Sequence, residues 1–372
     1  MRASALSLSL LFVVGCPPRS TADAGSERDA GDAWSYVDPD VPVRDAGFAS
    51  CAMTSASADR LPTSLLFQFD TSGSMNCPAI PTGPCAVADP TSDPTDSRWD
   101  VFRGRVSEAL EALPDVTRAG LMHYPDPATS CASTTADVPI AELTTTRSLI
   151  QGVLGGLVPE SITPTHDAVR NGIAQLTSRM DEQRFLVLAT DGAASVCLGC
   201  DAGCSFEARD ADNEAMINYV AEQAAAGIST YVIGVPGSQG FRRILSRMAS
   251  AAGTARADCS DAGPRYCHFD LTDETVDFSM ALRDALLAIG RSVVSCTYTI
   301  PPNPDGVFDP SLINVRLVDD AGLEEVIPQG ASGWSYSGDM LRVELSPAVC
   351  ERARALRTGR VDVLFGCPTI IL

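Results

Sequence analysis

The chain has 372 residues, and 45% of them are hydrophobic. Its 27 cationic side chains are all arginine, whereas 47 side chains are acidic, so the formal net charge is −20. A surface of this charge repels phosphate backbones and excludes nucleic acid as an expected partner. It also attracts divalent cations in a general way, so a metal site must be argued from specific ligands.

Residues 1–16 predict a signal peptide, with Arg2 ahead of an apolar segment that is too short to span a bilayer. Val13-Val14-Gly15-Cys16 resembles a bacterial lipobox, in which the signal is cut before a cysteine that carries lipid. This resemblance implies lipidation at Cys16 and an exported protein anchored to the cell envelope, by default at the outer membrane or cell surface. The alternative is an ordinary secretory signal followed by an unrelated cysteine.

Residues 17–50 predict a flexible, acidic tether. They contain repeated Asp-Ala-Gly units and few large apolar side chains. A coil of this length has a root-mean-square reach of roughly 30–35 Å. We expect the tether to hold the folded part of the chain away from the bilayer.

From Leu65 onward, apolar runs alternate with segments of helical periodicity. The predicted strands are Leu65–Phe69, Ala119–Tyr124, Val138–Leu143, Phe185–Thr190, Ile228–Ile233 and Tyr266–Leu271. The predicted helices are Trp99–Leu113, Thr146–Leu157, Thr165–Met180, Asp212–Ala226, Phe241–Ala252 and Glu274–Arg291. Nearly continuous apolar strands indicate a sheet that is covered on both faces. We therefore expect residues 51–295 to form an α/β domain with a doubly wound, mostly parallel sheet.

Residues 296–372 differ in pattern, because short alternating runs are separated by Pro, Asp and Gly. The predicted strands are Cys296–Ile300, Asn314–Val318, Glu325–Pro328, Leu341–Leu345 and Val361–Phe365, with a short helix at Ser346–Leu356. We expect a separate, small β-rich domain.

Thirteen cysteines become twelve once Cys16 is set aside, and an even number indicates disulfides in an oxidising compartment. The predicted pairs are Cys51–Cys296, Cys77–Cys85, Cys259–Cys267, Cys350–Cys367, and Cys131 with a member of the cluster Cys197, Cys200 and Cys204. Thiolate binding of zinc is the alternative for this cluster, although it lacks a second CxxC pair.

Hard oxygen ligands gather where the first strand of the α/β domain ends. Asp70, Ser72 and Ser74 follow it with the spacing Asp-x-Ser-x-Ser. Such oxygens suit Mg²⁺, Ca²⁺ or Mn²⁺ rather than zinc or copper. Ligands of parallel sheets bind at the carboxyl ends of strands. Two further candidates stand at such places, Asp191 directly after a buried strand and Thr163 in a loop that leads into a helix.

With these residues in order, residues 64 to about 292 resemble a von Willebrand factor type A (vWA) domain. Its metal-ion-dependent adhesion site matches Asp70-x-Ser72-x-Ser74, Thr163 and Asp191. The resemblance implies the doubly wound fold. It also implies that the three hydroxyls contact the ion directly, whereas the two carboxylates often act through water.

The loop of Thr163 departs from the family pattern. The usual Gly-Gly-Thr reads Ser161-Ile162-Thr163 here. Thr165 is the fallback ligand, although we expect it to cap the following helix. His166 is expected to open that helix rather than to act as an acid or base.

Three neutral hydroxyls leave a divalent ion able to accept a further carboxylate. We therefore expect a binding protein that grips a Glu or Asp of a protein partner through Mg²⁺, with Ca²⁺ and Mn²⁺ as alternatives. Two long loops beside the site, 76–96 and 197–204, favour recognition. The alternative is a structural envelope lipoprotein in which the metal only stabilises loops. No catalytic elbow, phosphate-binding loop or dinucleotide fingerprint occurs in the sequence, so we expect no enzyme.

Overall fold

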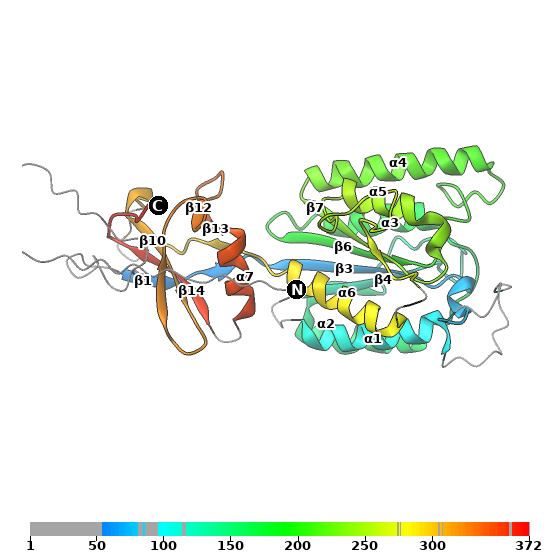
Figure 1. Cartoon of the computed structure of the whole chain (residues 1–372), viewed down its shortest axis with the longest axis horizontal. Coiled ribbons are helices and arrows are strands. Elements are labelled where there is room, and N and C mark those ends of the chain that lie inside the picture. The colour runs from blue at the N-terminus through cyan, green and yellow to red at the C-terminus, as the bar shows by residue number, and fades with distance from the viewer. Residues whose placement is uncertain are drawn as a thin grey trace, which may run out of the picture. The chain divides into compact units, whose positions relative to one another are not determined.

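The computed structural model describes residues 54–371 apart from 81–84, 86–95, 114–116, 274, 276, 304–305, 307 and 357–358. The predicted signal peptide, Cys16, the tether 17–50 and Cys51 lie outside the described residues. What is described belongs to one compact unit, Cys51–Leu372. This unit contains an α/β domain and a β domain (Figure 1).

Six strands form the sheet of the α/β domain, in the order β5-β4-β3-β6-β7-β8. Their bounds are β3 Thr63–Asp70, β4 Arg118–Tyr124, β5 Val138–Glu142, β6 Gln183–Thr190, β7 Ile228–Gly234 and β8 Phe269–Asp270. β5 is antiparallel to β4, and all other neighbours are parallel. Every residue of β3, which lies inside the sheet, is buried. The predicted doubly wound, mostly parallel sheet is confirmed.

Helices cover both faces of this sheet (Figure 1). Their bounds are α1 Arg98–Ala112, α2 Leu143–Gly156, α3 Thr165–Leu176, α4 Phe206–Ala225, α5 Arg242–Ala251 and α6 Phe278–Ser292. α1, α2 and α6 share one apolar core, which includes Phe102 and Leu282. α3, α4 and α5 share the other, which includes Val169 and Val220. Two cores on opposite faces explain why the central strands are apolar on both sides.

Several elements begin or end a few residues from the predicted bounds: α2 begins at Leu143 rather than Thr146, α3 ends at Leu176 rather than Met180, and α6 begins at Phe278 rather than Glu274. α4 begins at Phe206 rather than Asp212, because the Ser205 hydroxyl accepts a hydrogen bond from the Ala208 N–H and caps the helix. Its first turns are largely exposed and carry no apolar periodicity, which hid them in the sequence. The strand predicted at Tyr266–Leu271 pairs with β7 only over Phe269–Asp270.

The β domain consists of two four-stranded sheets, β1-β14-β10-β11 and β12-β13-β9-β2. Its strands are β1 Thr54–Ser57, β2 Asp59–Arg60, β9 Thr297–Thr299, β10 Ile313–Val318, β11 Glu324–Ile327, β12 Trp334–Tyr336, β13 Arg342–Leu345 and β14 Arg360–Phe365. The sheets share one apolar core around the fully buried Trp334, and helix α7, Pro347–Ala355, packs on it. The predicted small β-rich domain is present.

The predicted domain boundary at residue 51 is wrong for residues 54–60. β1 pairs with β14 and β2 pairs with β9, both antiparallel, so these residues belong to the β domain. Strands this short carry too little periodicity to show their partners. The α/β domain, Thr63–Ser292, is therefore inserted between two parts of the β domain.

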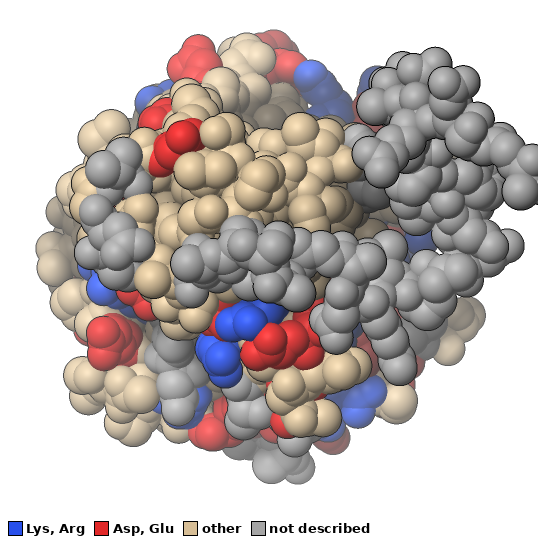
Figure 2. Space-filling model, turned by 90° about the vertical axis from the view of Figure 1, so that its left-hand side faces the viewer, with Lys and Arg blue, Asp and Glu red and all other residues tan. Residues whose placement is uncertain are grey.

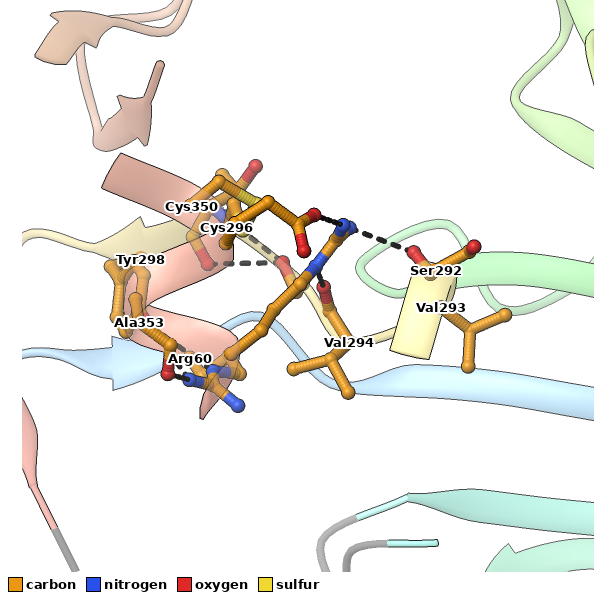
Figure 3. Close-up of a disulfide and its surroundings, with 12 residues drawn as sticks. Arg60, Ser292, Val293, Val294, Cys296, Tyr298, Cys350 and Ala353 are labelled. Atoms are coloured by element: carbon orange, nitrogen blue, oxygen red, sulfur yellow. Dashed lines mark hydrogen bonds and ion pairs between the residues drawn. A yellow bond between two sulfur atoms is a disulfide. The ribbon is translucent and has the colours of Figure 1, made fainter. Parts of the chain in front are cut away.

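The Cys296–Cys350 disulfide ties the start of β9 to α7 (Figure 3). Beside it, the Arg60 guanidinium donates to the Tyr298 hydroxyl at 3.0 Å and to the Ala353 carbonyl at 3.1 Å. Residues from both parts of the discontinuous β domain are thereby joined.

The predicted disulfides Cys51–Cys296 and Cys350–Cys367 are wrong, because Cys296 and Cys350 are bonded to each other. The β domain brings β9 and α7 together, with the two Cα atoms 5.4 Å apart, and spacing along the chain cannot show this. Cys367 is also disulfide-bonded.

The other predicted pairs, Cys77–Cys85 and Cys259–Cys267, occur in the structure. Cys131 pairs with Cys200, a member of the predicted cluster, and Cys197 pairs with Cys204. All three cysteines of the cluster are therefore oxidised, and the zinc alternative is wrong.

His268 gives the α/β domain a pH-dependent stability. Its ring is buried, Nδ1 lies 3.0 Å from the Ser246 hydroxyl, and burial lowers its pKa to about 4. Asp270 raises this pKa, whereas Arg242 and Arg256 lower it further. The folded pKa lies below the unfolded value, so the stabilisation is complete above about pH 6.5 and is lost as the pH falls through about 4.

We expect the free energy of unfolding to fall by about 2–3 kcal/mol from this source between pH 7 and pH 4.5. Urea unfolding at both pH values should show a smaller decline in His268→Gln than in the wild type. Equal declines in the two proteins would contradict this role of His268.

No helix among the described residues has the length and apolar character needed to cross a membrane. Figure 2 shows the side of the molecule that bears the β domain. Red and blue side chains lie next to each other on it, between large areas of uncharged residues. Opposite charges therefore offset one another on this face despite the net charge of the chain.

Candidate metal centre

The first part of the predicted site is a turn at the carboxyl end of β3. Asp70, the last residue of β3, is buried, and its Oδ1 accepts a hydrogen bond from the Ser72 N–H at 2.8 Å. Its Oδ2 accepts a hydrogen bond from the Thr190 hydroxyl, at the end of β6, at 2.6 Å. A 3₁₀ helix, η1 Gly73–Asn76, follows and turns the chain back. These contacts fix the Asp-x-Ser-x-Ser segment against the neighbouring strand.

The second part is Asp191, directly after β6. Its Oδ1 accepts a hydrogen bond from the Ser74 hydroxyl at 2.8 Å, and the Ser74 hydroxyl lies 3.2 Å from that of Ser72. Because β3 and β6 are parallel neighbours, their carboxyl ends carry these residues to the same edge of the sheet. Four of the five predicted ligands thus belong to one cluster of hydrogen-bonded side chains.

The backbone of the loop that contains Thr163 makes hydrogen bonds to the turn after β3 and to the loop after β6. The Ser161 carbonyl accepts a hydrogen bond from the Gly73 N–H at 3.1 Å, and the Thr163 N–H donates to the Ser195 hydroxyl at 2.8 Å. Ser161 has φ 68°, a backbone conformation that glycine adopts more readily than serine. Thr163 is buried, but its hydroxyl makes no hydrogen bond to another described side chain of the cluster.

Thr165 does not cap α3 as predicted. The helix begins after Pro164 and has no side-chain cap. The Thr165 hydroxyl is buried and has no hydrogen-bond partner among the described residues. His166 lies in the first turn of α3, as predicted, with Nε2 3.0 Å from the Asn213 side-chain oxygen.

Arg98 is the residue of this site that the sequence did not reveal. Its Nη1 donates to Asp191 Oδ2 at 2.7 Å, and it lies 3.4 Å from the Ser74 carbonyl. The side chains of Arg98 and Asp191 are only 10% and 1% exposed. Arg98 is the first residue of α1, where the helix dipole disfavours a cation, and this is the one local signal of another role.

The two carboxylates are short of positive charge. Burial raises the pKa of Asp70, and the nearby Asp191 carboxylate raises it further. Burial also raises the pKa of Asp191, although Arg98 opposes the shift. One arginine for two buried carboxylates leaves a charge deficit that a cation would offset. With hydroxyl oxygens beside it, the donor set fits a hard divalent ion.

Loops that carry disulfides surround the cluster. Cys131–Cys200 joins the loop after β4 to the loop after β6, and the Asp167 carboxylate accepts hydrogen bonds from the N–H groups of Gly199 and Cys200. These contacts hold the loop after Asp191 to the start of α3.

No protein-family model matches the sequence, and no curated protein has a matching sequence. Similar solved structures include the PilB minor pilin from Streptococcus sanguinis, at 19% identity and a TM-score of 0.43, covering 63% of this chain and 61% of that one. The vWF domain of the type V pili tip protein Mfa5 from Porphyromonas gingivalis has 10% identity and a TM-score of 0.40, with 63% and 95% covered. A von Willebrand factor type A structure from Catenulispora acidiphila has 10% identity and a TM-score of 0.40, with 86% and 66% covered. The chain spans about three fifths of the length of the PilB structure.

Proposed function

We propose that the chain binds a divalent cation, Mg²⁺ before Ca²⁺ or Mn²⁺, and uses it to hold a carboxylate of a protein partner. The ligands would be Asp70, Ser72, Ser74, Thr163 and Asp191. The observation that carries the proposal is the pair of buried carboxylates, which accept hydrogen bonds from hydroxyls and have only one arginine beside them.

The chemistry of the donor set supports binding rather than catalysis. A bound divalent ion would supply a coordination position for one further oxygen, since the chain offers mostly neutral hydroxyls. The residues of the chain would position the ion, and they keep the Asp70 and Asp191 carboxylates buried.

Exposed apolar side chains in the surrounding loops support a protein partner. Ile80 follows β3, Val158 lies between α2 and α3, and Phe206 lies at the start of α4. Their exposed fractions are 76%, 67% and 76%. Protein interfaces combine buried apolar side chains with polar contacts, and exposed apolar side chains near a polar site fit that composition.

We further propose that the protein is exported and anchored in the bacterial envelope by lipid on Cys16. The five disulfides formed among the described residues support an oxidising compartment. The tether 17–50 would give the binding domain reach from the outer membrane or cell surface.

Capture from envelope extract tests this function. Thr163→Ala removes one hydroxyl without changing charge or breaking the cluster of hydrogen bonds. Thr145→Ala makes the same change on an exposed part of α2 and is the control. We expect the wild type and Thr145→Ala to capture a partner in Mg²⁺ but not in EDTA, and Thr163→Ala to capture it in neither.

Calorimetric titration of Mg²⁺ separates the alternatives. If the protein binds Mg²⁺ but captures its partner equally well in EDTA, the structural lipoprotein is favoured. The metal would then only stabilise the fold. Failure of the wild type to bind any divalent ion would overturn the metal site itself, and the β domain would become the region to test for partners.

A further inference from the structure

We propose that Arg98 is a resident cation of the site, which balances Asp191 when no ion is bound and weakens the binding of the ion. The domain would thus stay folded without metal and release metal readily. This inference rests on the proposed metal site and goes beyond it, because it assigns a positioning role to a residue outside the ligand set.

The contacts of Asp191 show why an ion and Arg98 compete. Oδ2 accepts from Arg98 at 2.7 Å, and Oδ1 accepts from Ser74 at 2.8 Å. Both oxygens are therefore engaged within the protein. An ion that draws on Asp191 must weaken one of these contacts, and it also meets the positive charge of the guanidinium.

The surroundings hold the guanidinium in place. A Cβ built on Gly237, which has φ 114°, would lie 2.3 Å from Arg98 Nη1 and 2.7 Å from the Asp191 carbonyl oxygen. The backbone of Gly237 therefore packs directly against this ion pair, and only glycine fits there. The Arg98 backbone N–H also donates to the Cys77 carbonyl at 2.8 Å, which anchors the start of α1.

Burial excludes a different use of Arg98. A side chain that is 10% exposed and packed against Gly237 cannot reach out to a partner's carboxylate. Its positive charge acts inside the site, on Asp191. Without it, Asp70 and Asp191 would be two buried carboxylates with no cation among their described contacts.

Calorimetric titration of Mn²⁺ and thermal melting in EDTA test the proposal. We expect Arg98→Gln to bind Mn²⁺ about tenfold more tightly than the wild type, since a repelling charge is removed. Its melting temperature in EDTA should fall, and Mn²⁺ should raise it by more than in the wild type. Arg98→Lys keeps the charge and should behave as wild type. Arg103 pairs with Asp100 and contacts the Gly155 carbonyl instead of Asp191, so Arg103→Gln should bind Mn²⁺ as the wild type does.

If the wild type binds Mn²⁺ and Arg98→Gln binds it no more tightly, the proposed role of Arg98 is overturned. The proposed metal site would still stand. If neither protein binds Mn²⁺, the proposed function fails with it. If Arg98→Gln cannot be recovered folded, the double variant Arg98→Gln/Asp191→Asn decides, because it removes both charges: its folding in EDTA supports the proposal, and its failure to fold overturns it.

Discussion

Asp70→Asn is expected to bind Mg²⁺ about 10–100-fold more weakly than the wild type, yet to be more stable when no ion is present. Asparagine has the same shape, so its side-chain oxygen can accept from the Ser72 N–H. The Thr190 hydroxyl can then accept from the asparagine amide group and donate to the Gly192 carbonyl, which lies 3.0 Å away. The change removes one of two buried carboxylates that share a single arginine. In EDTA at pH 7 the free energy of unfolding should rise by about 1–3 kcal/mol.

Calorimetric titration of Mg²⁺ measures the first effect, and urea unfolding in EDTA measures the second. Asp284→Asn, on an exposed part of α6, makes the same chemical change away from the site and should alter neither quantity. A loss of stability in EDTA together with a loss of binding would show that Asp70 is structural. Wild-type affinity in Asp70→Asn would rule it out as a ligand.

The Cys131→Ser/Cys200→Ser variant is expected to lose about 4 kcal/mol of stability. This disulfide closes a loop of sequence separation 69, which restricts the unfolded chain strongly. It also ties the loop after Asp191 to the loop after β4. Because these loops adjoin the metal ligands, we expect weaker Mg²⁺ binding as well as lower stability.

Cys259→Ser/Cys267→Ser is the matched control. It removes a disulfide of sequence separation 8, and the same relation predicts a loss of only about 2.5 kcal/mol. It should leave Mg²⁺ affinity unchanged. Equal losses of stability in the two variants, measured by urea unfolding, would mean that loop length does not determine their contributions.

The sequence predicted those parts of the site that are local. Asp70, Ser72 and Ser74 share one turn, and Asp191 follows the next strand of the sheet, so strand ends and residue chemistry sufficed to group them. Arg98 could not be found in this way. It reaches Asp191 from the start of a helix that follows the long loop 76–96, and only the packing of α1 against the sheet places it there.

The errors in the fold have the same origin. β1 and β2 are short, and their partners β14 and β9 lie hundreds of residues further along the chain, so nothing local assigns them. The Cys296–Cys350 disulfide depends on that same assembly of the β domain. By contrast, the strands of the α/β domain were predicted well, because burial on both faces makes them continuous apolar runs.

The inserted position of the α/β domain determines how a pulling force would travel through the molecule. β3 leads from the connection with β2 to Asp70 without interruption, and its eight residues span about 26 Å. At the connection, the Leu61 N–H donates to the Thr297 carbonyl and the Thr63 hydroxyl to the Val293 carbonyl, so the two links to the β domain are fastened together. If a partner is held at Asp70 as proposed, its pull would run along β3. The backbone hydrogen bonds that join β3 to β4 and β6 would then be loaded in shear, parallel to the strands. Many hydrogen bonds would resist it at once, and the β domain would receive the load through two covalent links instead of one.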